Sequence, residues 1–317
     1  MTNKLLIALL CVAMLFSCQQ EDSSLEQVSG EANGLVLPDQ KSGVNNYNWM
    51  TKRYKTMAGV NRNLHELDIY YPTNMSNRPV VIYVHGGGWK QGDKSQQLQN
   101  KINLAMSNNI VLVSVNYRLS PNPANPSNIY RVKYPDHNND VADAVMWVYQ
   151  NITTFNGDKD NLVLLGHSAG GHLVSLTGTR KSLLQSRGFP MQSLKGVASI
   201  DIEAYNIYKK SITEGNITYH NAFGTDANTC FEASPEFNLW GASGYYPRFF
   251  IGMRGSANWK ADQYKFIQTL QGASIPVDYL DAGNAYNHAQ INDAIGAPGE
   301  TIITPALLSF FNTCFNN

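Results

Sequence analysis

Short apolar runs recur along most of this chain, and polar or amphipathic segments separate them. A run that is apolar at nearly every position is typical of a strand covered on both faces, whereas apolar residues three or four positions apart predict a helix. The predicted strands are residues 67–71, 80–84, 110–115, 162–165, 197–202, 249–253 and 277–280. The predicted helices are residues 95–106, 138–150, 169–177, 262–271 and 302–315. This alternation predicts an α/β fold, with a mostly parallel central sheet and helices on both of its faces.

Two connecting segments are longer than plain loops need to be. They are residues 120–136, which contain four prolines, and residues 204–240. In sheets of this kind the chemically active groups gather at the carboxyl ends of the strands. We therefore expect these segments to form the rim of a site, or a small lid over it.

The first residues have the pattern of an export signal. Lys4 precedes an apolar run at 5–16, which is too short to span a bilayer because a spanning helix needs about 20 residues. The end of this run, Leu15-Phe16-Ser17-Cys18, resembles the lipobox of bacterial lipoproteins, which implies cleavage before Cys18 and a lipid on its sulfur. Residues 18–45 are too polar to bury a core. We expect a signal peptide at 1–17, a flexible tether at 18–45, one folded domain at 46–317, and a lipid-anchored location in the bacterial cell envelope.

Charge and cysteine content narrow the possible functions. The chain has 24 basic and 24 acidic residues, and charged residues make up only 15% of it, so we expect no basic face and no nucleic-acid partner. Cys11 falls within the signal and Cys18 carries the lipid, which leaves Cys230 and Cys314. Their spacing does not decide whether these two form a disulfide. Cysteines and histidines are not spaced as zinc ligands, so we expect no metal and no other cofactor.

The strongest chemical signal is the run Gly166-His167-Ser168-Ala169-Gly170, which lies between a predicted strand and a predicted helix. In so tight a turn the central serine needs a positive φ, and only very small residues two positions before and after it avoid a clash. The turn lifts the serine oxygen clear of the sheet and places the backbone N–H of Ala169 where an oxyanion would form. We therefore expect Ser168 to be a nucleophile; the alternative is a glycine-rich turn without chemistry.

A second glycine-rich segment follows the predicted strand at 80–84 and has the sequence His85-Gly86-Gly87-Gly88-Trp89. Consecutive glycines let a ligand approach the backbone closely, so that the chain offers N–H groups in place of side chains. This run and the serine turn occur in the order expected for one site. We expect the N–H groups of Gly86, Gly87 and Ala169 to form an oxyanion hole.

Four motifs together resemble those of known enzymes. They are HGGGW at 85–89, NYRLSP at 116–121, YPDHNNDVADAVMWV at 134–148 and GHSAGGHL at 166–173. As a set they resemble the α/β-hydrolases of the hormone-sensitive-lipase-like and acetyl or feruloyl esterase groups, and HGGxW with GHSAGGHL is also similar to the arylformamidases. The resemblance covers about residues 67–296. It implies an α/β-hydrolase fold and a Ser-His-acid mechanism on small carboxylic esters.

The partners of Ser168 are less clearly marked. His288 follows the predicted strand at 277–280 on a loop at the carboxyl edge of the sheet, a position that suits the base. The resemblance implies an acid soon after the strand at 249–253, but Gly255-Ser256-Ala257-Asn258 stands there, and an asparagine cannot stabilise an imidazolium as a carboxylate does. An aspartate at the end of an apolar strand is costly unless it is paired. We therefore favour Asp201 as the acid and keep three alternatives: Asn258, Asp262 and Glu203.

These observations favour a lipid-anchored serine esterase that works through an acyl-enzyme on small acyl esters, without a cofactor. Acetyl or feruloyl groups on polysaccharide are the preferred substrates, by analogy with the family. Two alternatives stay open. One is an arylformamidase-like amide hydrolase, and the other is a non-catalytic surface binding protein on a hydrolase scaffold, which the asparagine at position 258 would suit.

Overall fold

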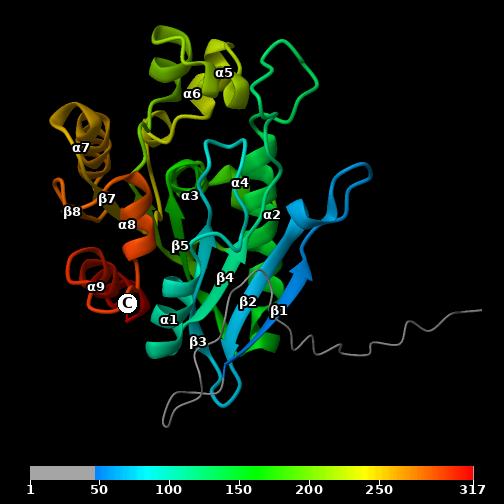
Figure 1. The fold of residues 1–317 in the computed structure, drawn as a ribbon, viewed down its shortest axis with the longest axis vertical. Helices are drawn as coiled ribbons and strands as arrows, with labels where there is room; N and C mark the ends of the chain where they lie inside the picture. Colours follow the sequence, from blue (N-terminus) through cyan, green and yellow to red (C-terminus); the bar gives the residue numbers. More distant parts are fainter. Residues whose placement is uncertain (1–46, 317) are drawn as a thin grey trace, which may run out of the picture. The chain divides into compact units, whose positions relative to one another are not determined.

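The computed structural model describes residues 47–316, drawn in colour in Figure 1. Its strands are β1 (Tyr47–Arg53), β2 (Glu66–Pro72), β3 (Arg78–Val84), β4 (Val111–Val115), β5 (Gly157–His167), β6 (Leu194–Ile200), β7 (Arg248–Met253) and β8 (Val277–Asp281). Its α-helices are α1 (Gln99–Ser107), α2 (Asp136–Asn151), α3 (Ala169–Thr179), α4 (Ser182–Gln185), α5 (Ile217–Phe223), α6 (Ala227–Glu232), α7 (Ala257–Gly272), α8 (His288–Ala294) and α9 (Ile303–Phe315). The predicted signal peptide, the tether and Cys18 lie outside the described residues. Within residues 47–316 no helix combines the length and the apolar character needed to cross a bilayer.

The strands form one sheet in the order β1-β2-β4-β3-β5-β6-β7-β8. β2 runs antiparallel to both of its neighbours, and every pair from β4 to β8 is parallel. The carboxyl ends of β3, β5, β6, β7 and β8 therefore meet at one edge, where residues far apart in the sequence come together. The mostly parallel sheet predicted from the apolar runs is confirmed.

The alternation of side chains along each strand divides the core between the two faces of the sheet. On β3, Val80, Ile82 and Val84 belong to one buried cluster, whereas Val81 and Tyr83 belong to a second. The first cluster includes residues of α2, α3 and α7, and the second includes residues of α1 and α9 (Figure 1). Strands that are apolar at every position are thus covered on both faces, as their pattern predicts.

The structure departs from the predicted elements where the pattern is partly polar. The apolar pattern does not predict β1, because β1 is an edge strand whose side chains are mostly half exposed. α7 begins at Ala257 rather than at residue 262, because the Ser256 side chain caps its N-terminus by accepting the N–H of Trp259. α1 begins at Gln99 rather than at residue 95.

The segment at 204–240 forms the small lid that its length predicts. It contains α5 and α6, which lie together beyond one end of the sheet (Figure 1). The proline-rich loop before α2 fastens α5, because Arg131 donates a hydrogen bond to the carbonyl oxygen of His220. On the other side of the lid, a ring nitrogen of His172 lies 2.8 Å from the carbonyl oxygen of Ala233. The lid is therefore fixed both to this loop and to α3.

The two cysteines left open by the sequence are not paired. Cys230 lies in α6 and Cys314 lies in α9, and both thiols are buried and free. They belong to different core clusters, on opposite faces of the sheet.

Candidate active site

Ser168 occupies the sharp turn between β5 and α3. Its φ of 54° and ψ of −124° lie outside the regions that side chains prefer, a strain of about 1–3 kcal/mol that surrounding contacts must offset. The flanking glycines are required, since a Cβ on Gly166 would lie 2.3 Å from the carbonyl oxygen of Gly170. A Cβ on Gly170 would lie 2.0 Å from the carbonyl oxygen of Val84. The turn predicted from the Gly-x-Ser-x-Gly run is therefore present, and it leaves Ser168 partly exposed.

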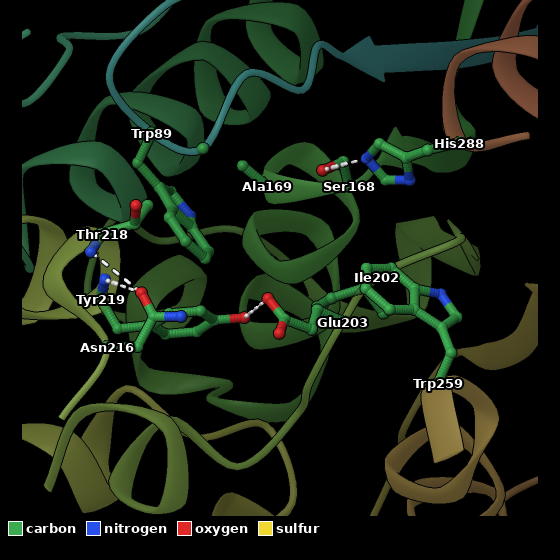
Figure 2. A pocket seen from close by; sticks show the side chains of 11 residues that line it. Trp89, Ser168, Ala169, Ile202, Glu203, Asn216, Thr218, Tyr219, Trp259 and His288 are labelled. Carbon is green, nitrogen blue, oxygen red and sulfur yellow. Dashed lines mark hydrogen bonds between the residues drawn. The ribbon is translucent and has the colours of Figure 1, made fainter. Parts of the chain in front are cut away.

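His288 is the first residue of α8, and its ring points at the serine (Figure 2). Its Nε2 lies 3.0 Å from Ser168 Oγ, and its Nδ1 lies 2.7 Å from Oδ2 of Asp201. An ionised carboxylate only accepts hydrogen bonds, so Nδ1 carries a proton and Nε2 offers its lone pair to the serine hydroxyl. In this arrangement a histidine can remove the serine proton.

Asp201 directly follows β6 and is fully buried, with a φ of 48°. Two further donors bind its carboxylate: Arg254 Nε lies 2.6 Å from Oδ2, and Trp259 Nε1 lies 2.8 Å from Oδ1. Burial alone would raise the pKa of Asp201, but the hydrogen bonds from His288, Trp259 and Arg254 outweigh it and hold that pKa below its ordinary value. The structure thus keeps an ionised carboxylate beside the histidine.

The other acids considered from the sequence lie elsewhere. Asp262 and Glu203 each form an ion pair with a lysine of the lid, and Asn258 is exposed on α7. Of the four candidates, Asp201 is the one whose side chain contacts the His288 ring. The three alternatives therefore do not fit the position of the acid.

Three residues that the sequence analysis does not single out hold this arrangement together. Arg254 directly follows β7 and Trp259 lies in the first turn of α7, close to where the family resemblance implies the acid, and both bind Asp201 instead. His167, beside the nucleophile, has its Nε2 2.9 Å from the carbonyl oxygen of His288. Burial lowers the pKa of His167 to about 3, so its neutral ring donates this bond and ties the base to the serine turn. The sequence offers no local signal for Arg254 or Trp259, whereas the place of His167 in the turn is a signal that could have been used.

The glycine run lies beside the serine turn, as predicted. A Cβ on Gly86 would lie 3.1 Å from Ser168 Cβ, and Gly88 and Ala169 line the same cavity as the serine. Among residues 47–316, no protein acceptor binds the backbone N–H of Gly86, Gly87, Gly88 or Ala169. Such groups need a partner from outside the protein, and a developing oxyanion is one that they suit. Gly88, which the sequence analysis does not single out as a donor, lines the cavity together with Ala169, whereas Gly86 and Gly87 are not among the lining residues.

A cavity of about 170 Å³ opens in front of Ser168 (Figure 2). Its lining combines the serine and His288 with the aromatic side chains of Trp89 and Trp259 and with polar residues of the lid. The cavity therefore has room for a small group beside the reacting atoms, with both apolar and polar walls.

Within the part of the chain that the structure describes, His167, Asp201 and His288 are the group that could bind a metal ion, with ligand atoms within 4.8 Å of one another. Asp201 and His288 already bind each other, and His167 already binds a backbone carbonyl. A metal ion at this place would therefore compete with the contacts among the serine, the histidine and the aspartate.

Several solved structures share this architecture. Esterase B from Lactobacillus Rhamnosis (HN001) aligns with a TM-score of 0.67 at 19% identity, over 85% of this chain and 86% of that chain. A truncated carbohydrate esterase from gut microbiota aligns with a TM-score of 0.66 at 14% identity, over 86% of this chain and 98% of that chain. The chain has the α/β-hydrolase fold. Within this α/β-hydrolase fold, residues 67–210 match the model of the BD-FAE family, a region that holds Ser168 and Asp201 but ends before His288.

Curated relatives match about a third of this chain. The para-nitrobenzyl esterase of Bacillus subtilis is 35% identical over 112 residues, which is 34% of this chain and 23% of that protein. Esterase LipC of Mycobacterium tuberculosis is 32% identical over 114 residues, which is 35% of this chain and 26% of that protein. The aligned part of the chain spans about a quarter of the length of these relatives.

Proposed function

We propose that this protein is a serine carboxylesterase. The observation that carries the proposal is the continuous series of contacts from Ser168 Oγ, through both ring nitrogens of His288, to the buried carboxylate of Asp201. The unpaired N–H groups beside Ser168 meet a second requirement, a place for developing negative charge. The similarity to esterases over about a third of the chain supports the same reaction.

In the proposed reaction, Ser168 Oγ attacks the ester carbonyl carbon while His288 Nε2 takes the hydroxyl proton. The N–H groups of Ala169 and the glycine run bind the negative carbonyl oxygen. His288 then gives its proton to the leaving alkoxide, and the acyl group stays on the serine. A water molecule, deprotonated by His288, attacks this acyl-enzyme. His288 then returns the proton to Ser168 Oγ as the bond between this oxygen and the acyl carbon breaks, and the carboxylic acid is released. Asp201 stays ionised throughout and stabilises the imidazolium.

We infer that the substrates are small acyl esters, with acetyl or feruloyl groups on polysaccharide as the favoured class. The match to the BD-FAE family and the likeness in fold to a carbohydrate esterase from gut microbiota support this inference. The volume of the cavity, about 170 Å³, suits a small acyl group. An arylformamidase-like amide hydrolase would use the same three residues. Only the substrate that is hydrolysed therefore distinguishes this alternative from an esterase.

A fluorophosphonate probe tests the nucleophile directly. We expect the intact protein to gain the mass of one probe less HF, because fluoride leaves as the serine–phosphorus bond forms, with the adduct on Ser168; the Ser168→Ala variant should gain none. Short-chain nitrophenyl esters and acetylated xylan, compared with N-formylkynurenine, then separate an esterase from an amide hydrolase. If the protein takes no probe and hydrolyses no ester, the proposal is wrong and a binding protein on a hydrolase scaffold remains.

We also propose that a lipid on Cys18 attaches the protein to the bacterial cell envelope, because the residues before it have the pattern of a lipoprotein signal. In cells fed a labelled fatty acid, the wild-type chain should take up the label and sediment with membranes. The Cys18→Ala variant should do neither. Label in that variant, or none in the wild type, would contradict the proposal.

A further inference from the structure

The cavity in front of Ser168 contains an acidic side chain that the proposed mechanism does not use. Glu203 lies two residues after Asp201 and lines the cavity, and Figure 2 shows it on the wall across from Ser168. Its side chain retains 36% of its full exposure. A carboxylate in a small cavity with tryptophan walls loses more hydration free energy than an apolar side chain would lose there. Glu203 therefore needs polar partners that offset this loss.

Glu203 has unused capacity to accept hydrogen bonds. Its Oε2 accepts the hydroxyl of Tyr219 at 3.3 Å, and its Oε1 lies 3.1 Å from Nζ of Lys210. Burial raises the pKa of Tyr219 well above its ordinary value, so the phenol remains a donor. A carboxylate has about four acceptor positions on its two oxygens, and these contacts use two of them.

The ion pair with Lys210 does not by itself account for Glu203. Lys210 lies in a π-helical turn of the lid, Lys209–Thr213, and its Nζ also lies 2.9 Å from Glu214. Glu214 can therefore balance the charge of Lys210 without help from Glu203. The two carboxylates differ in position: Glu203 lines the cavity, whereas Glu214 is not among the lining residues.

We infer that Glu203 is a specificity-determining residue, whose carboxylate accepts a hydrogen bond from a neutral hydroxyl group of the ester substrate. The inference rests on the proposed function and extends it from the reaction to the choice of substrate. The hydroxyl can come from two sources: a phenol on the acyl group, or a sugar hydroxyl on the alcohol. In both cases the donor is neutral, and a substrate that carries its own carboxylate there is repelled.

Two matched pairs of substrates test the inference and separate the two sources. Methyl 4-hydroxycinnamate and methyl cinnamate differ in a phenolic hydroxyl on the acyl side. Methyl 2-O-acetyl-xylopyranoside and its 3,4-dideoxy analogue differ in the free hydroxyls on the alcohol side. The wild-type enzyme should prefer the hydroxylated member of one pair in kcat/KM, by about 10- to 100-fold, the range expected for a hydrogen bond to a charged group.

The variants of Glu203 should lose this preference. In Glu203→Ala the ratio of kcat/KM within the preferred pair should fall to about one, and Glu203→Gln should retain part of it, because an amide oxygen still accepts a hydrogen bond. Glu214→Gln is the matched control: it also removes a charge from Lys210, but at a site not among the cavity lining residues, and it should leave the ratio unchanged. Thermal unfolding of each variant shows whether the fold is retained.

Several outcomes would overturn the inference. They are a preference that persists in both Glu203 variants, a loss of equal size in Glu214→Gln, or a wild-type enzyme that prefers neither hydroxylated substrate. A wild-type enzyme that takes the fluorophosphonate on Ser168 but hydrolyses none of the four esters also overturns it, while the proposed nucleophile stands. Failure of that labelling would instead reject the proposed function itself.

Discussion

The ends of β5 and β6 present Ser168 and Asp201 in closely similar backbone settings. Each residue directly follows its strand, and their φ angles are 54° and 48°. Each also donates its backbone N–H to the neighbouring strand: Ser168 to the carbonyl oxygen of Ile200 at 2.9 Å, and Asp201 to that of Gly252 at 2.7 Å. Two adjacent strand ends thus turn two side chains toward one histidine, each from a residue with a positive φ that donates its N–H to the next strand.

The two turns are stabilised in different ways. The turn at Ser168 depends on Gly166 and Gly170, which stand two positions away on either side. Asp201 stands between Ile200 and Ile202, and its side chain is held by partners 53 to 87 residues away in the sequence. A turn that depends on its own neighbours can be recognised in a sequence, whereas one that depends on distant side chains leaves little local pattern.

The largest expected effect comes from removing the side chain of the first turn. Ser168→Ala should lower kcat on nitrophenyl acetate by about 10⁶-fold, because no acyl acceptor remains. The backbone of the turn depends on the glycines rather than on the hydroxyl, so the midpoint of thermal unfolding should stay close to that of the wild type. A variant whose kcat falls far less than this would show that the acyl group is carried elsewhere.

The second turn should give the next largest effect. Asp201→Asn should lower kcat by about 10⁴-fold, because an amide can donate to His288 and hold the ring in the wrong tautomer. Asp262→Asn is the control, since Asp262 pairs with Lys209 of the lid, and its kcat should change only slightly. Near-normal turnover in Asp201→Asn, in a protein that remains folded, would remove Asp201 from the mechanism.

The distant donors that hold Asp201 can be tested through the pH dependence of activity. Arg254→Leu removes a charged donor 2.6 Å from the carboxylate that helps to hold the pKa of Asp201 below its ordinary value, so that pKa should rise. The acid limb of the profile of kcat/KM against pH should then move to higher pH, with a loss of about 10-fold at the plateau. Arg254→Lys should keep the position of the limb, because it keeps the charge. If neither variant moves the limb, Arg254 only packs against the acid.

The smallest expected effect is on stability, and it concerns the segment just before His288. Glu300 accepts hydrogen bonds from the hydroxyl of Tyr286, two residues before His288, and from the N–H groups of Ile303 and Thr304 in α9. Burial alone would raise the pKa of Glu300, but the hydrogen bonds, chiefly those from Thr304 and Tyr286, lower it to about 2.

A group whose pKa is lowered by folding stabilises the protein above its unfolded pKa, and this contribution is lost as the pH falls through the folded value. Glu300→Gln should therefore unfold at a lower urea concentration than the wild type at pH 6, and the two midpoints should approach each other near pH 2.5. A gap that does not change with pH would show that Glu300 does not act through its charge.

Much of the fold and part of the site could be predicted from the sequence, for reasons visible in particular residues. The strands of the parallel sheet are buried on both faces, so they are continuous apolar runs, and β1 escapes prediction because its edge position leaves its side chains half exposed. The serine turn and the glycine run are recognisable because steric demands fix their residue types locally.

The acid shows where prediction from the sequence reaches its limit. Asp201 could be favoured because a carboxylate at the end of an apolar strand needs a partner. Its donors Arg254 and Trp259 could not be assigned, because an arginine and a tryptophan near a helix start have many ordinary roles. Only the meeting of β6, β7 and β8 at one edge of the sheet brings these side chains together.

The three side chains placed at the reaction centre come from the ends of β5 and β6 and from the start of α8, and the lid contributes none of them. The lid instead supplies part of the cavity wall, through residues such as Thr218 and Tyr219. Bond breaking is therefore assigned to the sheet edge, whereas the cavity wall is shared between that edge, which carries Glu203, and the lid. Exchange of the lid between related enzymes, by recombination in nature or by grafting in the laboratory, can alter which esters are accepted. The reacting groups at the sheet edge would stay the same.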